Sequence, residues 1–202
     1  MFEFLKPKAK PIDFNVKLLI ITDTHNCLEE EELNNINADV CLLLGDITDR
    51  DLSIIKQKVD IPIYGILGNH DSWTLYDKYN IENIHGKVID IYGIKIAGLQ
   101  GSIRYKLSDA PLYTDDESVE ISKTIPYTDI LISHDCPKYL YGKNNFAHSG
   151  LKGITEYCNK NRTPLNIHGH HHKRTLSKLK NGTVCIGCYG VQIIDTAKFA
   201  NC

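Results

Sequence analysis

Five short apolar runs, each followed at once by residues that can bind a metal ion, constrain this sequence more than any other feature. The runs cover residues 17–21, 40–44, 61–67, 130–132 and 164–167, and each has the length of a buried strand. In an open α/β sheet, ligands bind at the carboxyl ends of such strands. The side chains that follow the five runs are therefore expected to share one site.

Helical patterns separate the first three runs. Residues 28–35 and 52–59 are predicted to be helices, and shorter or later helices are expected after Asp71 through Tyr79, over 116–124 and over 150–159. Strands that alternate with helices across short connections indicate right-handed βαβ units and a parallel sheet.

Two turn signals change this pattern in the middle and at the end of the chain. Tyr92-Gly93 and Asn181-Gly182 each lie between apolar stretches and predict β-hairpins. Antiparallel pairs are therefore expected beside the parallel ones, and a last strand over 191–194 would close the domain.

Length and composition are those of an ordinary globular protein. The 202 residues, 42% of them apolar and 24% charged, suffice for one domain with a substantial core. We predict an N-terminal extension over residues 1–16 and a single domain over residues 17–202. The formal net charge of −2 gives no overall electrostatic footprint for nucleic acid.

The sequence also predicts where the protein works. No run approaches the roughly 18 apolar residues of a membrane span, so no membrane partner is expected. The N-terminus lacks the continuous apolar stretch of a signal peptide. The seven cysteines form no disulfide-like framework, which favours a reducing cytoplasm.

The residues after the five runs offer hard oxygen and imidazole donors and no thiolate. These donors are Asp23, His25, Asp46, Asn69, His134, His170 and His172. Mixed oxygen and nitrogen donors suit Mn, Fe, Ni or Zn better than an all-oxygen Ca or Mg cage. Seven donors exceed the needs of one ion with an open catalytic position. Two ions that share a carboxylate fit better, because such a pair can clamp both the attacking and the leaving oxygen of a displacement.

These residues carry a resemblance to the calcineurin-like metallophosphoesterase superfamily. Its five motifs occur in order as Asp23-x-His25, Gly45-Asp46-x-x-Asp49-Arg50, Gly68-Asn69-His70-Asp71, a lone His134, and Gly169-His170-x-His172. The resemblance covers roughly residues 17–195. It implies a four-layered α/β/β/α sandwich of two mixed β-sheets, which agrees with the predicted switch to hairpins.

The resemblance also implies how the donors divide between two divalent ions. Manganese is the expected metal, with iron, nickel or zinc as alternatives. Asp23, His25 and His172 would bind the first ion. Asn69, His134 and His170 would bind the second ion. Asp46 would bridge the two, since a carboxylate has two oxygens to give.

Catalytic roles follow from the same resemblance. A metal-bound hydroxide would attack phosphorus in line. His70, with Asn69 beside it, would contact the phosphate, and His70 would protonate the departing alkoxide as general acid. Asp71 would orient and charge-stabilise His70.

Other residues allow more than one interpretation. Arg104 is either a contact for the substrate phosphate or a surface arginine. His168 either hydrogen-bonds a ligand or packs at a strand end, and His171 is expected to be solvated or to lie behind the ligands. His148 is predicted to be a loop residue whose loop can face substrate. Cys185 and Cys188 are expected to be ordinary thiols.

The compact chain with its Gly68-Asn69-His70-Asp71 motif resembles the bacterial-type phosphodiesterase and general phosphoesterase branch of the family. This resemblance implies hydrolysis of a phosphodiester in a small phosphorylated substrate, either nucleotide-like or of another kind. A phosphomonoesterase or protein phosphatase, a nuclease with the same core, and a non-catalytic binding module are the alternatives. Loops 100–116 and 135–149 are expected to set specificity. Assembly of identical copies is left open.

Overall fold

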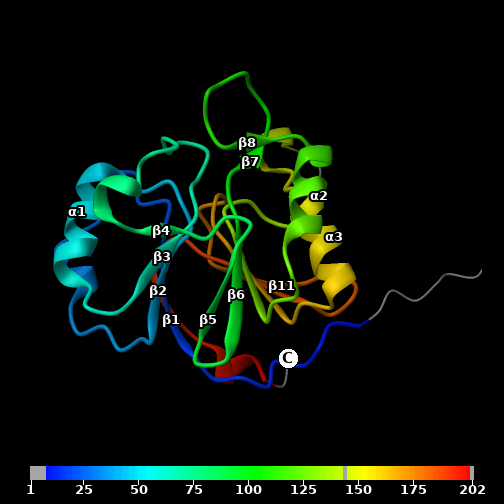
Figure 1. Cartoon of the computed structure of the whole chain (residues 1–202), viewed down its shortest axis with the longest axis horizontal. Helices are drawn as coiled ribbons and strands as arrows, with labels where there is room; N and C mark the ends of the chain where they lie inside the picture. The colour runs from blue at the N-terminus through cyan, green and yellow to red at the C-terminus, as the bar shows by residue number, and fades with distance from the viewer. Residues whose placement is uncertain (1–7, 143–144, 201–202) are drawn as a thin grey trace, which may run out of the picture.

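Two mixed β-sheets stacked face to face, with helices on both outer faces, give the chain four layers (Figure 1). The computed structural model describes residues 8–142 and 145–200. The expected α/β/β/α sandwich is therefore confirmed. The helical layers are α1 (Asp49–Lys58) on one side, and α2 (Asp115–Thr124) with α3 (Lys152–Asn161) on the other.

The first sheet has the strand order β13-β1-β2-β3-β4. Its strands are β1 (Lys17–Thr22), β2 (Val40–Leu43), β3 (Ile63–Gly65), β4 (Glu82–Asn83) and β13 (Gly190–Asp195). Strands β1 to β4 pair in parallel, whereas β13 lies antiparallel to β1.

The second sheet has the strand order β11-β12-β10-β9-β6-β5. Its strands are β5 (Val88–Ile91), β6 (Ile94–Leu99), β9 (Ile130–Ser133), β10 (Leu165–His168), β11 (Thr175–Lys178) and β12 (Val184–Gly187). Both predicted hairpins form, as the antiparallel pairs β5–β6 and β11–β12. A separate parallel pair joins β7 (Ser102–Ile103) to β8 (Leu112–Tyr113).

Alternate side chains of the central strands fill two different layers of the core. Leu18 and Ile20 of β1 face the second sheet, whereas Leu19 and Ile21 face the layer that contains α1. On the far side, Leu131 of β9 packs in the cluster beneath α3. Strands buried on both faces are expected to be apolar throughout, which is why the five runs lack an alternating pattern.

Several predicted helices are shorter than expected. Residues 28–35 form only a single 3₁₀ turn, η1 (Glu30–Leu33), because a capping box at Glu29 closes the turn and Asn34 is already extended. The helix expected before Tyr79 is limited to η2 (Asp77–Tyr79), which ends at Asn80 in a left-handed conformation. Two further short turns are η3 (Phe146–His148) and η4 (Thr196–Phe199).

The described part of the N-terminal extension lies against the domain. Ile12 and Val16 are buried in the core between the sheets, and the backbone amide of Ala9 donates to the carbonyl oxygen of Asn181 at 2.7 Å. Residues 1–7, which include Lys6, lie outside the described residues.

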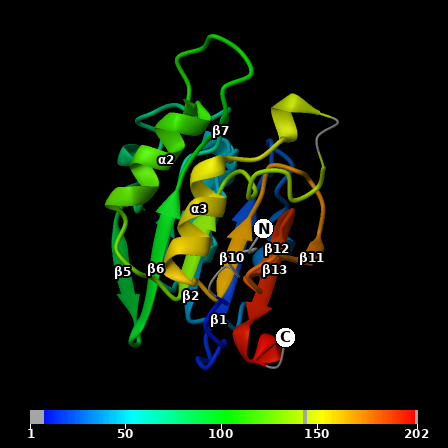
Figure 2. The ribbon, with the colours of Figure 1, turned by 90° about the vertical axis from the view of Figure 1, so that its right-hand side faces the viewer.

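The topology brings the five predicted donor segments to one end of the sandwich. Strands β1, β2 and β3 run parallel in the first sheet, and β9 and β10 run parallel in the second. Figure 2 shows β1 and β10 pointing to the same end of the molecule. Over residues 8–142 and 145–200, no helix is long and apolar enough to cross a membrane.

Candidate metal centre

Three of the predicted donors converge beyond the ends of β1 and β10. The ligand atoms of Asp23, His25 and His172 all lie within 4.8 Å of one another. The Nε2 atoms of the two histidines are 3.1 Å apart, and His172 Nε2 is 3.4 Å from Asp23 Oδ1. The resemblance assigned these three residues to the first ion, and the fold brings them together.

The surroundings of Asp23 Oδ1 show whether this group of residues fits a cation. The atom is buried, and among the described residues it has no hydrogen-bond partner. A buried carboxylate oxygen without a partner is costly. A metal ion held by the two neighbouring imidazoles would supply that partner, so the residues present fit a cation.

A second group forms where β2, β9 and β10 end. The ligand atoms of Asp46, His134 and His170 also lie within 4.8 Å of one another. His134 Nδ1 lies 2.7 Å from the carbonyl oxygen of Leu44, and His170 Nε2 lies 3.0 Å from that of Ala147. Because a carbonyl oxygen only accepts, these contacts assign the protons to those nitrogens. The other nitrogen of each ring keeps a lone pair for a metal ion.

Asn69 and Asp46 complete this arrangement. Asn69 Oδ1 lies 3.0 Å from His134 Nε2, so the amide oxygen and the imidazole point to the same place. Asp46 Oδ2 is 3.5 Å from His134 Nε2 and 3.9 Å from His25 Nε2. One carboxylate oxygen therefore stands between the two groups, where a bridging ligand would be needed.

The backbone is strained at most of these donors. Positive φ is uncommon outside glycine, and strained residues of this kind cluster at functional sites. The candidate ligands with left-handed backbone are Asp23 (φ 54°), His25 (45°), Asp46 (54°), His170 (65°) and His172 (50°). These loops are shaped to aim side chains rather than to continue regular structure.

Two glycines allow the loops after β2 and β3 to touch. A Cβ atom on Gly45 would lie 2.1 Å from the backbone nitrogen of Gly68, and a Cβ atom on Gly68 would lie 2.1 Å from Asp46 Oδ1. No side chain fits at either position without moving the backbone. The glycines that precede Asp46 and Asn69 in the two motifs therefore have a steric cause.

Asp71 joins the same two loops through hydrogen bonds. Its carboxylate accepts hydrogen bonds from the backbone amides of Asp46, Ile47 and Gly68 at 2.9, 3.2 and 2.7 Å. The expectation that Asp71 orients the His70 ring differs from this geometry, because the carboxylate is engaged with backbone amides of its own and the neighbouring loop. Burial, followed by the charge of Asp46, raises the pKa of Asp71 to about 6.

His70 lies at the exposed edge of the centre. Its side chain reaches solvent, and its ring meets the ring of His25 edge-on at 5.8 Å between centroids. Its backbone amide donates to Asp46 Oδ1 at 2.8 Å. The residue is fixed by its backbone while its ring stays accessible, as a group that contacts substrate needs to be.

The electrostatics of the centre favour a cation. Burial alone would lower the pKa of His134, but the negative charges of Asp46 and Asp23 outweigh it and raise that pKa. For Asp23, burial is opposed chiefly by the neighbouring His172 imidazole, 3.4 Å from Oδ1, and the pKa of the carboxyl falls below its usual value. The raised pKa of His134 reports the negative charge of the two carboxylates, whereas the lowered pKa of Asp23 reports the donors and imidazoles that stabilise its anion.

Arg50 and Asp51 support the first loop. Asp51 Oδ2 accepts hydrogen bonds from the Thr24 hydroxyl at 2.6 Å and from the Asn26 amide at 2.9 Å. Arg50 Nη1 donates to Asp51 Oδ1 at 2.9 Å and to the carbonyl oxygen of Leu28 at 3.0 Å. Buried Asp51, paired with the exposed Arg50, therefore fixes the loop that carries two of the donors.

Two aromatic residues at the centre, Tyr105 and Tyr189, were missed by sequence reasoning, and a third, His148, was expected only as a loop residue. The Tyr105 hydroxyl lies 3.4 Å from Asn69 Nδ2. Tyr189 stacks on His172 at 5.1 Å, and His148 stacks on His170 at 4.8 Å. They come from loops far away in sequence, and only His148, through its loop, had been connected with substrate.

Two further histidines, His168 and His171, lie near the centre without belonging to either group of donors. His168 is buried, its Nε2 lies 3.1 Å from the Tyr141 hydroxyl, and burial lowers its pKa to about 4. His171 is half-buried, with Nε2 3.8 Å from Asp135 Oδ1. Neither is among the converging donors described above.

Arg104 is already paired. Its Nη2 donates to the carbonyl oxygen of Leu112 at 3.0 Å and lies 2.8 Å from Glu117 Oε2. A phosphate contact by Arg104 stays a prediction, and such a contact would compete with Glu117 for the guanidinium.

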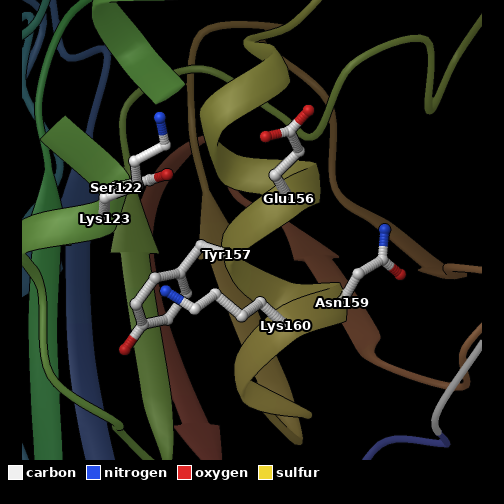
Figure 3. Close-up of a pocket in the computed structure, with 6 residues that line it drawn as sticks. All are labelled: Ser122, Lys123, Glu156, Tyr157, Asn159 and Lys160. Carbon is white, nitrogen blue, oxygen red and sulfur yellow. The ribbon is translucent and has the colours of Figure 1, made fainter. Parts of the chain in front are cut away.

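A pocket of about 440 Å³ lies away from these residues, between α2 and α3 (Figure 3). Its lining includes Lys123, Tyr157 and Lys160. None of the residues that line it is a candidate ligand, and it belongs to the outer helical layer rather than to the strand ends.

Comparisons with known proteins agree with this geometry. A family model described as calcineurin-like phosphoesterase matches residues 16–174. An uncharacterised protein of Haemophilus influenzae is 27% identical over 180 residues, which cover 69% of this chain and 75% of that protein. A probable glycerophosphodiester phosphodiesterase, GpdQ, of Arcobacter nitrofigilis is 32% identical over 118 residues, 50% of this chain and 42% of that protein.

Solved structures share the fold. TT1561 of Thermus thermophilus has a TM-score of 0.64 at 13% identity, with 91% of this chain and 100% of that chain covered. A dimetal phosphatase from Danio rerio has a TM-score of 0.56 at 11% identity, with 90% and 88% covered. At such identities the likeness supports the fold alone.

Proposed function

This chain belongs to the calcineurin-like phosphoesterase family, and we propose that within it the protein is a phosphodiesterase that uses two divalent metal ions. Hydrolysis of phosphoric esters is the chemistry of the family. The proposal extends this to the ester class, the number of ions and the role of each residue.

One observation carries the proposal, namely the position of Asp46 between two groups of donors. Its Oδ2 atom lies within 4 Å of an imidazole nitrogen from each group, at 3.5 and 3.9 Å. A single ion would leave one of the groups unused. Two ions would use both groups, with Asp46 available to each. Asp23, His25 and His172 would hold the first ion, and Asn69, His134 and His170 would hold the second.

Two divalent ions bound there would acidify a water molecule and stabilise negative charge on the phosphoryl oxygens. The protein's own part is to place groups around the phosphate. His70, exposed beside His25, donates a proton to the alkoxide oxygen that leaves. The Asn69 amide and the His70 ring orient the phosphate between them.

Asp71 has a different role in this proposal from the one the resemblance implied. By accepting three backbone hydrogen bonds it fixes the loops that carry Asp46 and Asn69. It is therefore a positioning residue that acts on the backbone of the donors.

The preference for a diester is supported by the relative from Arcobacter nitrofigilis, whose name specifies a phosphodiesterase. That match spans less than half of the relative, so the diester is part of the proposal. Manganese is the ion we propose, because the donor set mixes oxygen with imidazole and contains no thiolate. We also propose a cytoplasmic protein, since the six cysteines among the described residues are free thiols.

The test is hydrolysis of a chromogenic phosphodiester beside the corresponding monoester. Metals are stripped and Mn, Ni, Zn or Mg is added back singly, with His70→Ala measured in parallel. We expect metal-dependent turnover that favours the diester and falls by about 10²-fold or more in the variant. Elemental analysis is the control, because His70→Ala should keep both ions. Equal turnover by the variant would remove His70 from the mechanism, and a preference for the monoester would reject the diester.

A further inference from the structure

A pocket of about 670 Å³ lies between the segment that follows His70, the loop 104–111 and helix α2. The loop 104–111 stands above β7 and β8 in Figure 1. Much of the pocket wall is apolar or aromatic, formed by Trp73, Leu112, Tyr113 and Ile121. Trp73 Nε1 donates to Asp109 Oδ1 at 3.0 Å, which ties the two segments together. We call this cavity the Trp73 pocket.

Two chain segments lead from the metal centre into the Trp73 pocket. Trp73 follows His70 by three residues. On the other segment, the Tyr105 hydroxyl lies 3.4 Å from Asn69 Nδ2, while the adjacent Arg104 lines the pocket. The Trp73 pocket is therefore connected to the metal centre through the residues that follow His70 and through the segment that carries Tyr105.

The charges around the Trp73 pocket disfavour an anion. Four carboxylates line it, from Asp109, Asp116, Glu117 and Glu120. The one cationic residue in its lining is Arg104, whose guanidinium lies 2.8 Å from Glu117. Glu117 and Glu120 are paired with Arg104 and Lys123, and Asp109 accepts a hydrogen bond from Trp73. The four carboxylates still outnumber these two cations, so a negatively charged group placed there would meet net negative charge, which is how a site rejects the wrong ligand.

We propose that the Trp73 pocket binds the alcohol part of the substrate and selects an apolar group without negative charge. The inference rests on the proposed function, because it takes the metal centre to hold the phosphoryl group. The group in the pocket is the one beside His70, and so the one that His70 protonates as it leaves. The alcohol released from the natural substrate is then apolar, and it carries neither a second phosphate nor a carboxylate.

The test uses methylphosphonate monoesters, whose one ester group carries the alcohol and whose carbon–phosphorus bond is not hydrolysed. Release of the alcohol is followed in parallel, so that binding is read before the ester is cleaved. Binding of the ethyl, benzyl and 4-carboxybenzyl esters to the metal-loaded protein is measured by calorimetry and by the emission of Trp73, the chain's single tryptophan. We expect the benzyl ester to bind at least about tenfold more tightly than the ethyl ester and to change the emission. The carboxylate of the third ester should abolish that gain.

Two variants locate the effect. Ala110→Leu narrows the pocket and should reduce the benzyl-to-ethyl ratio to below about twofold. Leu107→Ala lies in the same loop, but Leu107 is 98% exposed and does not line the pocket, so the ratio should not change.

The outcomes separate the two proposals. Binding of the ethyl ester with no gain for the benzyl ester overturns the inference and leaves the phosphoesterase centre in place. Equal binding of the benzyl and carboxybenzyl esters overturns the charge selection. If none of the esters binds to protein that holds two ions, the proposed function itself fails.

Discussion

The two groups of candidate ligands differ sharply in their exposure to solvent. In the first group, the side chains of His25 and His172 are 37% and 47% exposed. In the second group, His134 is fully buried and Asp46 is 2% exposed. The second group is therefore the buried half of the centre, enclosed between the two sheets. The first group is the exposed half, whose two histidines reach solvent.

The two groups also differ in what holds them. His134 and His170 are fixed through carbonyl oxygens of Leu44 and Ala147. The contacts of His172 within the described part of the chain are with side chains, namely the stacked ring of Tyr189, the carboxylate of Asp23 and the ring of His25. We therefore expect the buried half to hold its ion tightly and the exposed half to exchange its ion with solvent.

The largest effect should come from the one residue that both halves share. Asp46→Asn replaces the bridging carboxylate by an amide, and we expect kcat/KM for a phosphodiester to fall by about 10³-fold. Elemental analysis should show loss of at least one ion. Asp60→Asn, an exposed carboxylate at the end of α1, is the matched control. Retention of activity and of both ions by Asp46→Asn would show that the halves work separately.

A smaller effect is expected when the exposed half alone is altered. His172→Ala should weaken binding of one ion by about 10- to 100-fold and leave the other in place. His171→Ala, at the neighbouring position, should keep both ions. In the unaltered protein, titration with a chelator followed by elemental analysis should remove the two ions in sequence. Simultaneous loss of both would contradict the assigned difference in exposure.

Asp71 tests whether the buried half depends on its backbone support. Asp71→Asn replaces one oxygen of a carboxylate that accepts three backbone hydrogen bonds by an amino group that can only donate, so at least one buried backbone amide loses its acceptor. We expect the free energy of unfolding of the metal-free protein to fall by about 2–3 kcal/mol, as measured in urea. Asp77→Asn, an exposed change six residues on, should cost less than about 0.5 kcal/mol. A similar loss for both variants would argue against a specific role for Asp71.

The smallest effect concerns a histidine outside both groups. His85 Nδ1 accepts a hydrogen bond from the Gln100 amide at 3.1 Å, and burial lowers its pKa to about 4. A histidine with a lowered pKa binds fewer protons when folded than when unfolded. Its contribution is therefore present above the unfolded value of about 6.5 and is lost as pH falls through 6.5 towards 4.

This linkage is measurable in the metal-free protein. Between pH 7 and pH 5 the protein should lose about 2 kcal/mol of unfolding free energy through His85. The variant His85→Gln should lack that part of the pH dependence. Parallel stability curves for the two proteins over this range would contradict the buried, neutral state of His85.

The strands and the hairpins were predictable because their signals are local. Lys17–Thr22 is apolar along most of its length, and Asn181-Gly182 fixes a tight turn, whatever the rest of the chain does. The strand expected over 61–67 shrank to β3 (Ile63–Gly65), since its later residues already belong to the loop that meets Gly45.

The supporting residues were harder to predict because their partners are distant in sequence. Asp71 follows His70 directly, which suggested a pair, yet its hydrogen bonds reach back to Asp46 and Ile47 on another strand's loop. Tyr105 carries no motif at all, and its place near Asn69 depends on how the pair β7–β8 positions its loop. Contacts of this kind come from tertiary packing, and short patterns do not contain them.

The donors come from both sheets, and this has a consequence for the cohesion of the fold. Asp23 and Asp46 follow strands of the first sheet, whereas His134 and His170 follow strands of the second. An ion held by both sets would act as a cross-link between the two halves of the sandwich. By mass action, a free ion concentration one hundred times its Kd would raise the free energy of unfolding by about 2.7 kcal/mol. The melting temperature of this protein should therefore follow the metal supply of its surroundings.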